Sequence, residues 1–172
     1  MHFRFCRGGN CNRCGETAYL SLVNPAIDKL HSTWVDDSIL AMQRPNDVLM
    51  KESNLIEQFK SNGIVAVFNL TEPGEHPYCG GGNLKESGFP YHPEKLMASG
   101  SKTLNHSKKC RNIVFEFHYT KYLLFYVVKH FNYAWPDMTA PSLNLMKDIV
   151  RVACNEIIQG GKVSIMYMDY MY

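Results

Sequence analysis

The clearest hydrophobic pattern in the chain is a nearly continuous apolar run from Ile64 to Leu70. A short run of this kind, directly after a glycine, is typical of a strand that is buried on both faces of a sheet. The residues before it predict a helix that Ser53 caps and that ends at Asn62-Gly63. The chain therefore enters a buried strand directly from a helix, an order that indicates layered α/β packing.

Two other regions have clear periodicity. Residues 33–42 predict two short strands joined at Asp36-Asp37. Near the end of the chain, Pro141 and Ser142 begin a predicted helix, Gly160-Gly161 ends it, and Val163 to Tyr167 forms the next predicted strand. The apolar positions that we expect this helix to bury are Leu143, Met146, Ile149, Val150, Ala153 and Ile157.

Strands that alternate with helices at this spacing predict an α/β domain. We expect a mixed sheet with a parallel centre, flanked by helices on both faces. The segment Phe89 to Pro93 predicts at most a short edge strand, because it contains two prolines. The loop from Thr71 to Gly82 is rich in Pro and Gly and follows the buried strand. Ligand-binding loops of open α/β sheets lie at this end of the strands.

Residues 99–128 do not fit the pattern. Their composition changes abruptly to Lys, Asn, Tyr, Phe, Ile and Leu, with the period of neither a helix nor a strand. A structureless segment of this length is uncommon inside a compact domain. Two interpretations are open: an untrimmed insertion such as a retained intron, or an additional surface hairpin.

Length and charge limit the classes of function. The chain has 172 residues, enough for one domain with a sizeable core, and a formal net charge of +2. That charge is too small to indicate a nucleic-acid or anionic-membrane partner. His2, Arg4 and Arg7 stand where the apolar region of a signal peptide would lie. We therefore expect a cytoplasmic protein with reduced thiols.

The six cysteines allow one alternative to plain thiols. Cys6, Cys11 and Cys14 lie close together, and the spacing of the last two suits zinc. No second pair of this kind follows, so reduced thiols remain the competing interpretation and we assign no metal site. We expect Cys154 to be a small packing residue on, or at the edge of, the buried face of its helix.

The combination of several segments resembles the cysteine-dependent phosphatases, the superfamily of protein tyrosine and dual-specificity phosphatases. The resemblance covers most of residues 31–98 and 130–165. Its main segments are His31 to Pro45, Ile56 to Phe59, Asn69 to His76, Glu86 to Phe89, and Phe131 to Asp137 with its Trp-Pro-Asp sequence. It implies a Cys-containing lead-in at 1–30 and a partial phosphatase domain at 31–172, with the atypical insertion at about 99–128.

The resemblance also implies a mechanism. In this superfamily a cysteine thiolate attacks phosphorus and forms a phosphocysteine, while an aspartic acid on a loop protonates the leaving group. It assigns the acid's role to Asp137, with Trp135 as a packing residue and Pro136 stiffening the loop. The alternative is that Asp137 is a turn residue capping the 141–159 helix region. Glu75 and His76 are expected to line the cleft, or else to form a solvated turn. The implied substrate is a phosphoprotein, and no cofactor is required.

The chain departs from the superfamily where the nucleophile should stand. The family pattern continues from the last strand into His-Cys-His-Ala-Gly-Leu-Gly-Arg-Thr-Gly, whereas Tyr167 stands here at the position of the cysteine. No cysteine of this chain has an arginine six positions later. The residues at those positions are Asn12, Thr17, Leu20, Lys85, Glu116 and Gly160.

We therefore expect the chain to contain only the N-terminal portion of the phosphatase fold and to be inactive. Without the helices that follow in the family, apolar surface should stay uncovered and the isolated chain should aggregate. Two alternatives remain open: a non-catalytic binding fragment, and a misassembled or alternatively spliced product.

Overall fold

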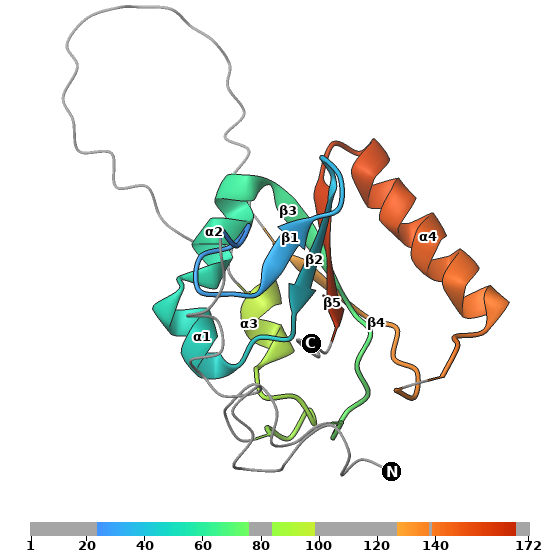
Figure 1. Cartoon of the computed structure of the whole chain (residues 1–172), viewed down its shortest axis with the longest axis horizontal. Helices are drawn as coiled ribbons and strands as arrows, with labels where there is room; N and C mark the ends of the chain where they lie inside the picture. The colour runs from blue at the N-terminus through green and yellow to red at the C-terminus, as the bar shows by residue number, and fades with distance from the viewer. Residues whose placement is uncertain (1–23, 76–83, 99–126, 138, 168–172) are drawn as a thin grey trace, which may run out of the picture.

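The fold is built around one five-stranded sheet. The computed structural model describes residues 24–75, 84–98, 127–137 and 139–167 (Figure 1). Within them the strands are β1 (Ser32–Trp34), β2 (Ile39–Gln43), β3 (Ile64–Asn69), β4 (Lys129–Asn132) and β5 (Lys162–Tyr167). The helices are α1 (Asp47–Glu52), α2 (Leu55–Asn62), α3 (Pro93–Met97) and α4 (Leu143–Ile158). None of these helices is both long enough and apolar enough to cross a bilayer.

The sheet has the order β1-β2-β5-β3-β4. Only β1 and β2 pair antiparallel; β2 with β5, β5 with β3, and β3 with β4 are parallel. Helices α1, α2 and α3 lie on one side of the sheet, and α4 covers the other (Figure 1). The expected α/β architecture, with its parallel centre and helices on both faces, is confirmed.

Several predicted elements are confirmed. The turn between β1 and β2 is stabilised by Asp36, whose Oδ1 accepts hydrogen bonds from the backbone N–H groups of Ser38 and Ile39. Strand β3 is buried on both faces, because Ala66 and Phe68 pack on one side and Ile64 and Val67 on the other. A glycine ends α2 as expected: Gly63 has φ +75°, a conformation that a glycine adopts without strain.

Two predicted local structures are wrong. Ser53 does not cap α2; it ends α1, a helix that the sequence did not predict, and Asn54 is the N-cap residue of α2. The segment Phe89 to Pro93 forms no strand, and Pro93 instead begins α3. Proline suits this position because the first residue of a helix has no use for a backbone donor.

The predicted buried face of α4 is also wrong in part. The structure buries Ile149 and partly buries Ala153 and Ile157, but leaves Leu143, Met146 and Val150 exposed. Cys154 is exposed as well, so it is not the packing residue that we expected. The helix is rotated so that its polar Glu156 faces the sheet, where Lys129 of β4 binds the carboxylate.

The ends of two irregular segments belong to the core. Ile27 and Leu30 are fully buried, so packing begins a few residues before the expected boundary at residue 31. Val128, at the end of the expected insertion, is also fully buried. Residues 1–23, which include Cys6, Cys11 and Cys14, and residues 99–126 lie outside the described part of the chain.

Candidate active site

The predicted site residues that the structure describes lie where the parallel strands of the sheet end. Strands β2, β5, β3 and β4 run in the same direction, so their carboxyl ends share an edge. Tyr167 ends β5, Glu75 follows β3, and Trp135, Pro136 and Asp137, which we call the acid loop, follow β4. The register aligns these ends: Asn69 of β3 pairs with Met166 on one side and with Asn132 on the other.

The acid loop begins as an extension of the sheet. The backbone N–H of Tyr133, one residue beyond β4, donates to the carbonyl of Asn69 at 2.8 Å. Trp135 is partly buried and packs in the apolar cluster between the sheet and α4. After the exposed Pro136 the chain turns, and the backbone N–H and hydroxyl of Thr139 donate to the Pro136 carbonyl. Packing on Trp135 and this turn fix both sides of Asp137.

Asp137 does not cap α4. The N-cap residue is Ser142, whose Oγ accepts a hydrogen bond from the backbone N–H of Leu145 at 3.2 Å. Asp137 is partly exposed. Asp137 itself lies in a turn, so the structure gives the N-cap position to Ser142 and leaves the acid role of Asp137 a prediction.

Glu75 uses its carboxylate within its own loop. Its Oε2 accepts a hydrogen bond from the backbone N–H of Glu72 at 2.7 Å, which closes the turn around Gly74. The backbone carbonyl of Glu75 accepts a second bond, at 3.0 Å, from the guanidinium of Arg44. These contacts favour the turn interpretation of Glu75, and His76 lies outside the described residues.

Arg44 is a residue of this edge that the sequence analysis did not single out. It directly follows β2, its side chain is almost fully buried, and its backbone N–H donates to the carbonyl of Tyr167 at 3.0 Å. Its backbone thus joins the end of β5, while its guanidinium carries positive charge to the loop that follows β3, where it contacts Glu75. The sequence contained one clue, an arginine between a strand and a proline.

The buried Tyr91 and the partly buried His130 of β4 form a neutral pair. The hydroxyl of Tyr91 is 2.9 Å from Nε2 of His130 on β4. Burial raises the pKa of Tyr91, against the opposing charge of Arg44, and burial lowers the pKa of His130, against the opposing charge of Glu94. Both groups are therefore neutral near pH 7 and support β4 without adding charge to the site.

The described residues contain no group of three or more His, Cys, Asp or Glu side chains that could hold a metal ion. Among them, Tyr167 is the last residue of β5. The arrangement thus places a carboxyl group on a loop and a buried arginine near the carboxyl ends of neighbouring parallel strands.

Comparison with known proteins identifies relatives of this chain. The chain is 34% identical over 158 residues, 92% of its length, to "Protein tyrosine phosphatase domain-containing protein 1" of Bos taurus and to that of Mus musculus. The protein of that name in Danio rerio is 34% identical over 81% of the chain. The chain spans only 16 to 17% of the length of these relatives. No protein-family model matches it.

Solved structures resemble the fold more distantly. Crystal structures of Tk-PTP in a mutant form and in its active form match 80% and 81% of this chain and 60% and 63% of theirs. Their TM-scores are 0.47 and 0.45, and their sequence identities are 17% and 18%.

Proposed function

Because the chain is homologous over most of its length to protein tyrosine phosphatase domain-containing protein 1, we propose that it supplies the sheet and acid loop of a protein phosphatase domain. The reaction is hydrolysis of phosphotyrosine in a phosphoprotein, with phosphoserine and phosphothreonine as further substrates. The proposal includes the cytoplasmic setting inferred from the sequence. The main observation in its favour is that the acid loop and the end of β5 share one edge of the sheet.

In this mechanism Asp137 acts twice. A thiolate at the end of β5 attacks phosphorus, the bond from phosphorus to the substrate oxygen breaks, and Asp137 gives its proton to that oxygen. Asp137, now a carboxylate, then takes a proton from water as that water attacks the phosphocysteine and releases phosphate. Backbone N–H groups and an arginine from the segment after β5 hold the phosphoryl oxygens in this superfamily.

The 172 residues contain no Cys followed by Arg at the sixth position, so we propose that they do not catalyse this reaction by themselves. The direct test uses the purified chain with p-nitrophenyl phosphate and a phosphotyrosine peptide. We expect neither a burst nor turnover. Any turnover by the purified chain would contradict the proposed inactivity, and its loss in Tyr167→Phe would assign that turnover to Tyr167. Peptide binding that survives Asp137→Ala would instead favour the binding fragment.

A chimera tests the role of Asp137. Residues 1–165 are joined to the segment of the bovine relative that follows its last strand, with its cysteine and arginine. Asp137→Asn should lower kcat by about 100- to 10,000-fold. The matched control is Asp148→Asn, an exposed carboxylate on α4 that pairs only with Arg151 among the described residues. Equal activity of the Asp137→Asn chimera and the unmodified chimera would refute the assignment.

The splicing alternative needs a separate measurement. Sequencing cDNA across the codons for residues 95–135 and past 165 decides whether residues 99–128 and Tyr167 belong to the transcript. A transcript without the insertion, continuing into a Cys with an Arg six positions later, supports an active phosphatase. A transcript that matches this sequence supports a role in binding.

A further inference from the structure

Asn69 is a buried polar residue with an unusual number of partners at the candidate site. It is the last residue of β3, the strand between β5 and β4, and its exposed fraction is 0%. A side-chain amide has two N–H donors and an oxygen with two lone pairs, and burial is costly unless they are bonded. An asparagine at this place must therefore find its partners in the loops that follow the strands.

The structure provides a partner for each of these positions. The Nδ2 group donates to Oδ1 of Asn132 at 2.9 Å and to the carbonyl of Thr71 at 3.2 Å. The Oδ1 atom accepts from the hydroxyl of Thr71 at 2.8 Å and from its backbone N–H at 3.3 Å. Because a backbone N–H can only donate, it sets the orientation of the Asn69 amide, and this in turn directs Nδ2 toward Asn132.

These bonds join two loops. Asn132 ends β4 and stands directly before the residues leading to Asp137, while Thr71 begins the loop that contains Glu75. The backbone of Asn69 adds to the connection, because its carbonyl accepts the N–H of Tyr133. A change in the position of either loop would therefore leave a polar atom of Asn69 buried without a partner.

We propose that Asn69 is a positioning residue that holds the acid loop and the loop after β3 in one arrangement at the active edge. Its catalytic importance rests on the proposed function, since Asn69 acts through Asp137. Its structural effect does not, and this allows the two to be tested separately. The pair Asn69–Asn132 is the central contact of the inference.

Trp135 reports on the acid loop. The chain contains two tryptophans, and the other, Trp34, lies on β1 under Lys162. In a Trp34→Phe background the tryptophan fluorescence of the full chain, excited selectively over its tyrosines, therefore comes from Trp135. We expect Asn132→Ala to shift the emission to the red and to increase quenching by acrylamide, because the loop loses its contact with Asn69. Asn132→Asp keeps the acceptor and should restore the original spectrum.

Two further variants test whether a change in Trp135 emission comes from the Asn69 contacts or from a general loss of structure. Asn69→Ala should have the larger effect on Trp135, because it removes the bonds to both loops. Asn46→Ala removes another fully buried amide, which caps α1 on the other side of the sheet, and should leave the Trp135 emission unchanged. The inference is wrong if Asn132→Ala leaves emission and quenching unchanged, or if Asn46→Ala alters them equally.

The chimera then separates this inference from the proposed function. Asn132→Ala in the chimera should lower kcat by about 10- to 100-fold with little change in KM, because a displaced acid affects the chemical step. If Asp137→Asn slows the chimera but Asn132→Ala does not, the positioning role is refuted and the phosphatase assignment stands. If the Trp135 spectra respond but Asp137→Asn has no effect on the chimera, the acid role of Asp137 is refuted and the loop contact remains.

Discussion

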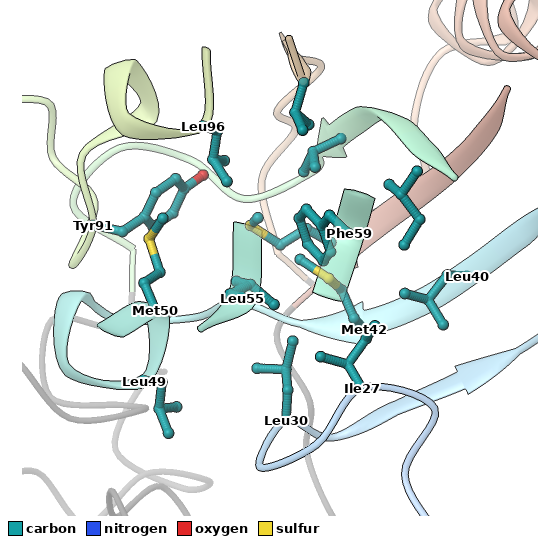
Figure 2. Packing of buried hydrophobic residues seen from close by; sticks show 14 of the residues in the cluster. Ile27, Leu30, Leu40, Met42, Leu49, Met50, Leu55, Phe59, Tyr91 and Leu96 are labelled. Atoms are coloured by element: carbon teal, nitrogen blue, oxygen red, sulfur yellow. The ribbon is translucent and has the colours of Figure 1, made fainter. Parts of the chain in front are cut away.

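The two faces of the sheet differ in how completely they are covered. On the first face, α1, α2 and α3 enclose fully buried side chains such as Leu55, Phe59 and Leu96 (Figure 2). On the second face, α4 is the only described helix. Among the apolar residues of α4, only Ile149 is buried. Most of the other apolar side chains of this second cluster, including Trp135, are partly exposed.

Because of this difference, one face should contribute most of the stability and the other contains the residues proposed to act in catalysis. Hydrophobic stabilisation is roughly proportional to the apolar area removed from water, so the first face should account for most of it. The second face contains the acid loop and leads from it directly into α4. The residues proposed to act in catalysis thus belong to the less densely packed half of the domain, where a change of position costs less.

The largest expected effect comes from removing matched leucines on the two faces. Leu55→Ala, at a position with no exposed surface, should lower the free energy of unfolding by about 2–5 kcal/mol. Leu145→Ala, on the partly exposed cluster beneath α4, should cost less than half as much because less buried area is lost. Urea unfolding followed by circular dichroism measures both. An equal decrease in the free energy of unfolding for both variants would show that the second face is buried as completely as the first.

A smaller effect should follow from the ion pair that fastens α4 to the sheet. Both carboxylate oxygens of the buried Glu156 lie 2.8 Å from Nζ of the half-exposed Lys129. Lys129→Met should cost about 1–3 kcal/mol, since it leaves a buried carboxylate without its cation. Lys147→Met, on the solvent side of α4, is the control and should be nearly neutral. A neutral Lys129→Met would mean that α4 is held by apolar contacts alone.

Sequence patterns predicted the elements of both faces better than their contacts. Apolar runs bounded by glycine identify β3, β5 and the ends of α2 and α4, because both burial and chain reversal leave a local trace. Helix α1 was missed because it has only six residues, too few for a period to be visible. Tyr91 was misplaced because an aromatic residue between prolines resembles an edge strand.

Local sequence patterns could not predict the orientation of α4 or the contacts between the site residues. Apolar residues occupy so much of the circumference of α4 that periodicity alone does not decide which side meets the sheet. Glu156 decides it, through a partner 27 residues earlier in the chain. Asn69 and Asn132 are 63 residues apart, so the sequence shows each amide but not their contact. Asp137 was identified only because its Trp-Pro-Asp sequence resembles a known family.

The first face should also give a modest pH dependence, through the partly buried His130 that pairs with Tyr91. Because burial lowers the pKa of His130, the unfolded chain binds a proton that the folded chain does not. The free energy of unfolding should therefore decrease as the pH falls from about 6.5 toward the lowered pKa. His130→Gln should reduce that slope in urea titrations at several pH values. An identical slope in the variant would assign the dependence to other groups.

Substitutions on the outer side of α4 should have the smallest effect on folding. They are also the most informative about how the second face is covered. Leu143, Met146 and Val150 lie three to four residues apart on one side of the helix, and Ile158 at its end is 84% exposed. We propose that this row is a surface through which the isolated chain associates, as the sequence led us to expect.

Val150→Gln should change the free energy of unfolding by less than about 0.5 kcal/mol, because the side chain is already 54% exposed. It should nevertheless lower the fraction of self-associated chain measured by sedimentation velocity at high concentration. Lys147→Gln, on the same helix without apolar surface to remove, should not lower it. If Val150→Gln destabilises the chain as much as Leu145→Ala does, the outer side of α4 is packed in the folded chain and the two faces are equally covered. If it leaves both stability and association unchanged, the exposed row is an ordinary surface and association must begin elsewhere, most directly from the edge strands β1 and β4.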